Sequence, residues 1–242
     1  MKTSPVHFFS LGALFVGSLL VPLCAAESDW QSLDIKQTTD PIFPLNLSRI
    51  GVTTGEARVA INTDAGGSLV EWLVIGYTNK EFADSAVKAI KRWSFSPARL
   101  RGELVGTTVE LRFFFSAQGV IVTRTNPSDL VEAQVMKMFA DRYSYFPRLR
   151  GELDRVPTPI VTVTPSYGAD LAKRGIEGRV RIQFYIDESG AVRLPSVSAK
   201  EDGVLTALAI DALKQWKFTP PVCRGRAVLV KASEEFQFGN GG

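Results

Sequence analysis

The second part of this chain repeats the first part at a constant offset of 123 residues, which restricts the fold more than any other feature of the sequence. The equivalent positions include Gly55 and Gly178, Asp64 and Asp187, Gly67 and Gly190, Ala86 and Ala209, Trp93 and Trp216, Phe95 and Phe218, Pro97 and Pro220, and Phe113 and Phe236. Upstream of these positions the offset becomes 124, where Pro41 aligns with Pro165. The sequence therefore predicts two tandem copies of one structural unit.

Each copy has the pattern of a β-β-α-β unit. In the second copy, apolar and polar residues alternate from Val180 to Ile186, as in a strand with one buried face. An Asp-x-x-Gly turn at residues 187–190 then predicts a hairpin. An apolar stripe at helical spacing ends at Trp216, and a proline four residues later ends the helix. We expect an α+β fold in which each unit lays one helix across a three-stranded antiparallel sheet.

The predicted strands and helices place a few residues at positions whose burial can be stated in advance. Glu234 falls on the predicted buried face of the last strand, where an unpaired carboxylate would cost several kcal/mol. We expect either a β-bulge near Ser233 or an edge position at which Glu234 reaches water. Trp93 and Trp216 end the apolar helical stripes, so we expect them to anchor the cores. Cys223 is expected to be a buried apolar residue.

The first residues have the composition of an export signal. Lys2 supplies a positive start, an apolar run covers residues 8–23, and small side chains precede Glu27. We expect cleavage after Ala26 and export to the periplasm. The alternative is an uncleaved anchor in the inner membrane, but the 16-residue apolar run is shorter than the roughly 20 residues that span a bilayer.

This cleavage would remove much of the side-chain chemistry available to an enzyme. His7, the one histidine of the sequence, and Cys24 would leave with the signal, so that Cys223 would remain without a partner for an intrachain disulfide. Histidine-dependent hydrolysis and histidine-ligated zinc are then excluded. A formal net charge of +3 is too small to indicate a nucleic-acid-binding protein. The sequence predicts neither an enzyme nor a cofactor or metal site.

The chain divides into five predicted segments. They are a signal peptide at 1–26, a leader at 27–40, a first module at 41–118, a helical connector at 119–158, and a second module at 159–240. Residues 127–141 have helical spacing, with Asn126 or Ser128 as the cap. The connector also contains Arg142, Arg148, Arg150 and Arg155. These arginines alternate with acids and aromatic residues, which favours a solvated surface, and weak lipid or glycan contact is the alternative.

The second copy carries a set of motifs with a known parallel. It combines a proline and aromatic pair, Gly-x-Val-x-Ile-x-Phe-x-Ile-Asp-x-x-Gly-x-Val, Ala-x-x-Ala, Trp-x-Phe-x-Pro and a final Phe-x-Phe. This arrangement resembles the C-terminal domain of TonB, and the first copy matches it in part. The resemblance implies a periplasmic module that binds outer-membrane transporters and passes on force from a proton-driven motor. The family's membrane anchor and proline-rich spacer are not visible in this sequence, so we expect the binding module rather than the motor coupling to carry over.

The resemblance implies a protein partner, and an outer-membrane transporter is the one expected. We expect the last strand, residues 228–238, to accept an extended peptide along its edge. The outward side chains Lys231, Ser233, Glu235 and Gln237 would then select the peptide, and Phe114 is a further interface candidate. The alternative is a structural envelope scaffold without a transporter partner, in which units pair edge to edge within the chain or in a homodimer.

Overall fold

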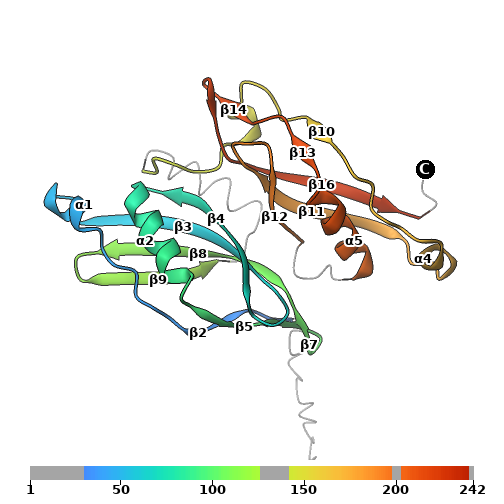
Figure 1. The fold of residues 1–242 in the computed structure, drawn as a ribbon, viewed down its shortest axis with the longest axis horizontal. Helices are drawn as coiled ribbons and strands as arrows, with labels where there is room; N and C mark the ends of the chain where they lie inside the picture. Colours follow the sequence, from blue (N-terminus) through green and yellow to red (C-terminus); the bar gives the residue numbers. More distant parts are fainter. Residues whose placement is uncertain (1–29, 126–141, 198–202, 240–242) are drawn as a thin grey trace, which may run out of the picture.

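The computed structural model describes residues 30–125, 142–197 and 203–239, and it has a mixed α+β fold with several antiparallel sheets and few helices. The predicted helix at 127–141 and the signal peptide lie outside the described residues. Figure 1 shows the first half (30–125) and the second half (142–239) side by side. None of the helices in the described ranges is long and apolar enough to cross a membrane.

Each half is built around one antiparallel sheet and one longer helix. The first half contains β3 (Thr54–Thr63), β4 (Leu69–Tyr77), α2 (Lys80–Ile90), β8 (Thr107–Ser116) and β9 (Gly119–Thr125), with strand order β4-β3-β8-β9. The second half contains β11 (Gly178–Ile186), β12 (Val192–Ser196), α5 (Val204–Leu213) and β16 (Val230–Phe238), with strand order β12-β11-β16. The prediction of three strands is correct for the second sheet. It is wrong for the first sheet, because β9 adds a fourth strand; the division into tandem modules stays a prediction.

Shorter elements surround the two sheets. They are β1 (Trp30–Gln31), β2 (Asp34–Gln37), α1 (Leu45–Arg49), β5 (Ser94–Ser96), β6 (Ala98–Leu100), β7 (Glu103–Val105), the 3-10 turn η1 (Arg150–Glu152), β10 (Pro159–Val161), α4 (Ala169–Lys173), β13 (Lys217–Phe218), β14 (Val222–Cys223) and β15 (Arg226–Ala227). β2 pairs with β5, and β10 pairs with β13, so in each half a leading strand covers the segment after the helix.

The predicted hairpin turns are present in both halves. The Oδ1 atom of Asp187 accepts hydrogen bonds from the backbone N–H groups of Ser189 and Ala191, at 3.0 Å each. Gly190 has a φ of 85°, which a residue without Cβ adopts at little cost. The equivalent Asp64 accepts from Gly66 and Ser68. The Asp-x-x-Gly spacing therefore predicted the turn geometry correctly.

Both tryptophans belong to the cores, as predicted. Trp93 is buried in the first core, and Trp216 packs against the second. Their indole N–H groups donate to backbone carbonyls of the leading segments, at Thr39 and Val163, with a distance of 2.9 Å each. Each helix ends three residues before its tryptophan, sooner than the apolar spacing predicts. The helices stop early because the following residues pair with the leading strands as β5 and β13.

The two halves contact one another through sheet faces. Ala60 lies between Val59 and Ile61 on β3, so it points away from α2, and Tyr185 likewise points away from α5. These faces form a third core, in which the buried residues are Ala60, Leu73, Ile75, Tyr185, Leu194 and Leu229. Among the described strands none pairs across the two halves. The edge-to-edge pairing within the chain is therefore not what the described residues adopt.

Candidate protein-binding edge

β16 forms one edge of the second sheet. It pairs antiparallel with β11 from Val230, opposite Ile186, to Phe238, opposite Gly178, without a register shift. The predicted bulge near Ser233 is therefore wrong, and the alternative of an edge position is correct. Glu234 is half-buried there, and this burial raises the pKa of its carboxyl group.

The outer side of β16 is closed only at its beginning. Arg148 forms an isolated parallel bridge with Val230, and its N–H group donates to the carbonyl of Leu229 at 2.8 Å. From Ala232 to Phe238, no other strand of the described ranges pairs with this side. Such an edge presents a row of backbone donors and acceptors that a further strand can use.

The side chains predicted to face outward from β16 lie beside this edge. Ser233, Glu235 and Gln237 are exposed, and Lys231 is half-buried. Glu235 forms an ion pair with Arg181 of β11 at 3.2 Å. Another arginine of β11, at position 179, donates to Gln237 at 2.7 Å. The face next to the open edge is therefore polar and carries charges of both signs.

Phe114 does not belong to this edge. It lies on β8, in the other sheet, where its backbone is paired with Glu56 on one side and Ile121 on the other. It is half-buried, and the guanidinium of Arg112 lies 4.4 Å from its ring centre. Lys231, Ser233, Glu235 and Gln237 thus lie along one strand of the second sheet, whereas Phe114 lies in the first sheet.

In the first sheet the equivalent strand is covered by a further strand. β8 corresponds to β16 at the offset of 123 residues, and β9 pairs with it from Ser116, opposite Gly119, to Glu110, opposite Thr125. Val120 and Val122 of β9 pack against the first core. Sequence reasoning missed β9, although the β-branched run at 120–123 directly after a glycine is a signal for a strand.

Buried polar side chains connect the faces of the two halves. The carboxylate of Glu110 on β8 is 3% exposed and pairs with Arg58 on β3 at 2.5 Å. The phenol of Tyr185, from the second half, donates to the same carboxylate at 3.1 Å. A buried charge has to be paired and hydrogen-bonded to be tolerated, so this contact favours one arrangement of the halves.

A second buried carboxylate, Glu56, binds the part of the connector at residues 142 and 143. Glu56 accepts from the phenol of Tyr143 at 2.6 Å and from Arg112 at 2.7 Å, and it pairs with Arg142 at 3.2 Å. Burial raises the pKa of Glu56, but the hydrogen bonds from Tyr143 and Arg112 outweigh burial and lower it overall. The connector residues 142 and 143 are thereby attached to the first sheet.

The phenol of Tyr143 should make stability sensitive to alkaline pH. Burial, followed by the hydrogen bond to Glu56, raises its pKa from 10.0 to about 12. Because the folded protein holds this proton more tightly than the unfolded chain, its stabilisation is complete below pH 10 and is lost as the pH rises toward 12. We expect the free energy of unfolding to fall across this range, and to fall less steeply in Tyr143→Phe. Urea denaturation at several pH values measures both slopes, and equal slopes would contradict this assignment.

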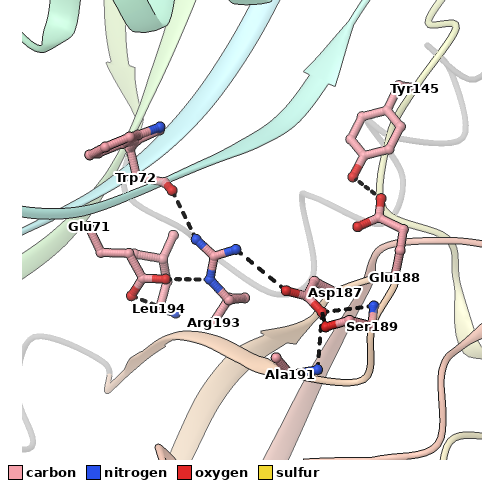
Figure 2. Close-up of polar contacts among 9 residues, drawn as sticks. All are labelled: Glu71, Trp72, Tyr145, Asp187, Glu188, Ser189, Ala191, Arg193 and Leu194. Carbon is pink, nitrogen blue, oxygen red and sulfur yellow. Dashed lines mark hydrogen bonds and ion pairs between the residues drawn. The ribbon is translucent and has the colours of Figure 1, made fainter.

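Figure 2 shows a third link, between the β11–β12 hairpin and β4. Arg193 donates to the carboxylate of Glu71 at 2.6 Å and to the carbonyl of Trp72 at 3.2 Å, and it pairs with Asp187 at 3.5 Å. Close by, Tyr145 donates to Glu188. The contacts of Arg193 with Glu71 and Trp72 attach the β12 side of the second sheet to the first half. β16 lies at the opposite edge of that sheet.

The outer side of β16 is a candidate surface for contact with another polypeptide. Residues 163–239, which include β11, β12, α5 and β16, match the family model described as Gram-negative bacterial TonB protein C-terminal. Protein TonB of Vibrio cholerae serotype O1 is 36% identical over 64 residues, which is 26% of this chain and 26% of that protein. This chain thus matches about a quarter of the relative's length. The half with the open edge is the half that resembles TonB.

Proposed function

We propose that the second half binds an extended segment of a partner protein by strand addition to the outer edge of β16. The open stretch from Ala232 to Phe238 supports this proposal, because a sheet edge supplies backbone hydrogen bonds to any strand that docks there. The match of residues 163–239 to the TonB C-terminal family supports the choice of partner. That partner would be an outer-membrane transporter, contacted in the periplasm, and the protein would act in transport without being an enzyme.

The first half offers a template for the bound peptide. β9 pairs with β8 where a partner strand would pair with β16. Its Val122 lies opposite Phe113, and its Val120 lies opposite Phe115, both on the core side. The equivalents of these phenylalanines at the 123-residue offset are Phe236 and Phe238. We therefore expect a partner segment with apolar residues at alternate positions, which would pack on these two rings.

Two proline variants test the backbone part of this proposal. Along a strand, successive N–H groups point to opposite sides, so of Ser233 and Glu234 one donates toward β11 and the other faces the open edge. Proline at the position facing the open edge removes a donor that only a partner would use. We expect that one of Ser233→Pro and Glu234→Pro keeps the fold and abolishes partner binding, whereas the other weakens the sheet. A well-folded form of both variants with unchanged binding would overturn the proposal.

Photo-crosslinking in whole envelopes identifies the partner. A photoreactive residue at Ser233 reports on the edge, and the same residue at Asp84, exposed on α2, is the matched control. Capture of an outer-membrane transporter from position 233 alone supports strand addition to β16. Capture of a second copy of this chain alone favours the alternative, a self-associating envelope scaffold in which two β16 edges pair.

A further inference from the structure

Three arginines from distant parts of the sequence meet at the β14–β15 hairpin. Arg148 comes from the segment before η1, and Arg224 and Arg226 come from the hairpin, which Figure 1 shows at the margin of the second half. The three side chains line a cavity of about 530 Å³, together with Glu152, Cys223 and Val228. Sequence reasoning considered Arg148 only with its neighbours in the connector, and it did not include the two arginines of the hairpin.

The fold holds this arrangement in place through Asp154. Its two carboxylate oxygens accept from the backbone N–H groups of Arg224 at 2.9 Å and Gly225 at 2.8 Å. The hydrogen bonds from Gly225 and Arg224 lower the pKa of this carboxyl group. In addition, the N–H group of Asp154 donates to the carbonyl of Val222. The connector and the hairpin turn are therefore fixed to each other, and they set the positions of the arginines.

The two carboxylates near the cavity, Glu152 and Asp154, accept hydrogen bonds from backbone N–H groups. Asp154 holds the hairpin turn, and the Oε2 atom of Glu152 accepts from the N–H group of Leu149 at 2.9 Å. Within the described ranges, no carboxylate lies within 4.0 Å of the guanidinium of Arg148, Arg224 or Arg226. The contact recorded for the Arg148 guanidinium is with the ring of Phe146, at 4.2 Å. Three guanidinium groups thus share a cavity with one lining carboxylate, that of Glu152, and it forms no ion pair with any of them in the described ranges.

We propose that this cavity binds the phosphate group of an anionic ligand. Guanidinium groups match phosphate oxygens with paired hydrogen bonds, and three of them can surround the non-bridging oxygens of one phosphate group, whether it is a free ion or a diester. A phosphate also brings about one to two negative charges to a cavity in which three arginines outnumber the one lining carboxylate, Glu152. Leu149, the neighbour of Arg148 in the chain, is 42% exposed. An exposed apolar side chain of this kind can contact the acyl chains of a lipid but contributes nothing to the binding of free phosphate.

The experiment compares two double variants of the full chain. Arg224→Gln with Arg226→Gln removes two cations of the cavity, and Arg179→Gln with Arg181→Gln removes two exposed cations of β11, so that the net charge of both variants is equal. The probes are inorganic phosphate, followed by calorimetry, and vesicles of phosphatidylcholine with or without phosphatidylglycerol, followed by sedimentation. Circular dichroism checks that the exposed substitutions leave the fold intact.

We expect the cavity variant to lose about tenfold in affinity for each arginine removed, and the β11 variant to change less than about twofold. Binding of phosphate alone identifies a soluble ligand, and binding of the phosphatidylglycerol vesicles identifies a lipid headgroup. Absence of binding to both probes would overturn the proposal. An equal loss in the two variants would overturn it as well, because it would mean attraction by net charge rather than a built site.

Discussion

Glu110→Ala should lower the free energy of unfolding by about 3–5 kcal/mol, because it breaks a buried ion pair by removing one partner. Glu110 is 3% exposed and pairs with Arg58, which is 9% exposed. Without the carboxylate, this guanidinium loses its buried ion pair with Glu110, and the phenol of Tyr185 loses its hydrogen bond to the same group. Denaturant unfolding followed by circular dichroism measures the change.

The matched control is Glu235→Ala, which removes a carboxylate from an exposed pair with Arg181. Surface pairs of this kind contribute little, so we expect a change below about 1 kcal/mol. Glu110→Gln should fall between the two, since an amide keeps a hydrogen-bond acceptor for Tyr185 but loses the charge. Similar losses in Glu110→Ala and Glu235→Ala would contradict the view that a buried charge cluster joins the halves.

Local patterns in the sequence predicted the parts of the fold that depend on neighbouring residues. The Asp-x-x-Gly turns, the strand alternation and the apolar helical stripes each depend on contacts within about twenty residues, and all are present in the structure. β9 was missed because the repeat has no counterpart to it in the second copy. A prediction that takes one unit as the template for the other cannot include an element present in only one of them.

The contact between the halves could not be predicted from the sequence in the same way. Ala60, Glu110 and Tyr185 lie on strand faces that alternation assigns to solvent, yet all three are buried where the sheets meet. Alternation identifies which residues share a face, but it does not say what covers that face. The same reason applies to Phe114, which was predicted as an interface candidate but is half-buried, with the guanidinium of Arg112 over its ring.

The different edges of the two sheets suggest a division of roles. In the first sheet β9 occupies the side of β8 that corresponds to the open side of β16, and β9 is then the edge strand of that sheet. The first half also holds the β12 side of the second sheet through Glu71 and Arg193. We therefore assign the support role to the first half and the binding role to the second, which remains part of the proposal.

Gly190→Ala should be among the most damaging small substitutions in the second half. Gly190 has a φ of 85°, and a Cβ atom there would lie 2.0 Å from the carbonyl oxygen of Phe218. The carbonyl cannot easily move, because the N–H group of Phe218 donates to the carbonyl of Gly190 at 2.9 Å. We expect a loss of about 2–4 kcal/mol in the free energy of unfolding, from the clash and the left-handed backbone together.

Gly225→Ala separates these two causes. Gly225 has a φ of 73°, but a Cβ atom there would meet nothing within 4 Å, so this variant pays only for the backbone conformation. We expect it to lose about 1–2 kcal/mol, measured by the same denaturant unfolding. The difference between the variants then measures the close approach of the β11–β12 turn to Phe218. This approach ties the turn to the segment after α5, and equal losses in the two variants would mean that the backbone at Phe218 yields freely.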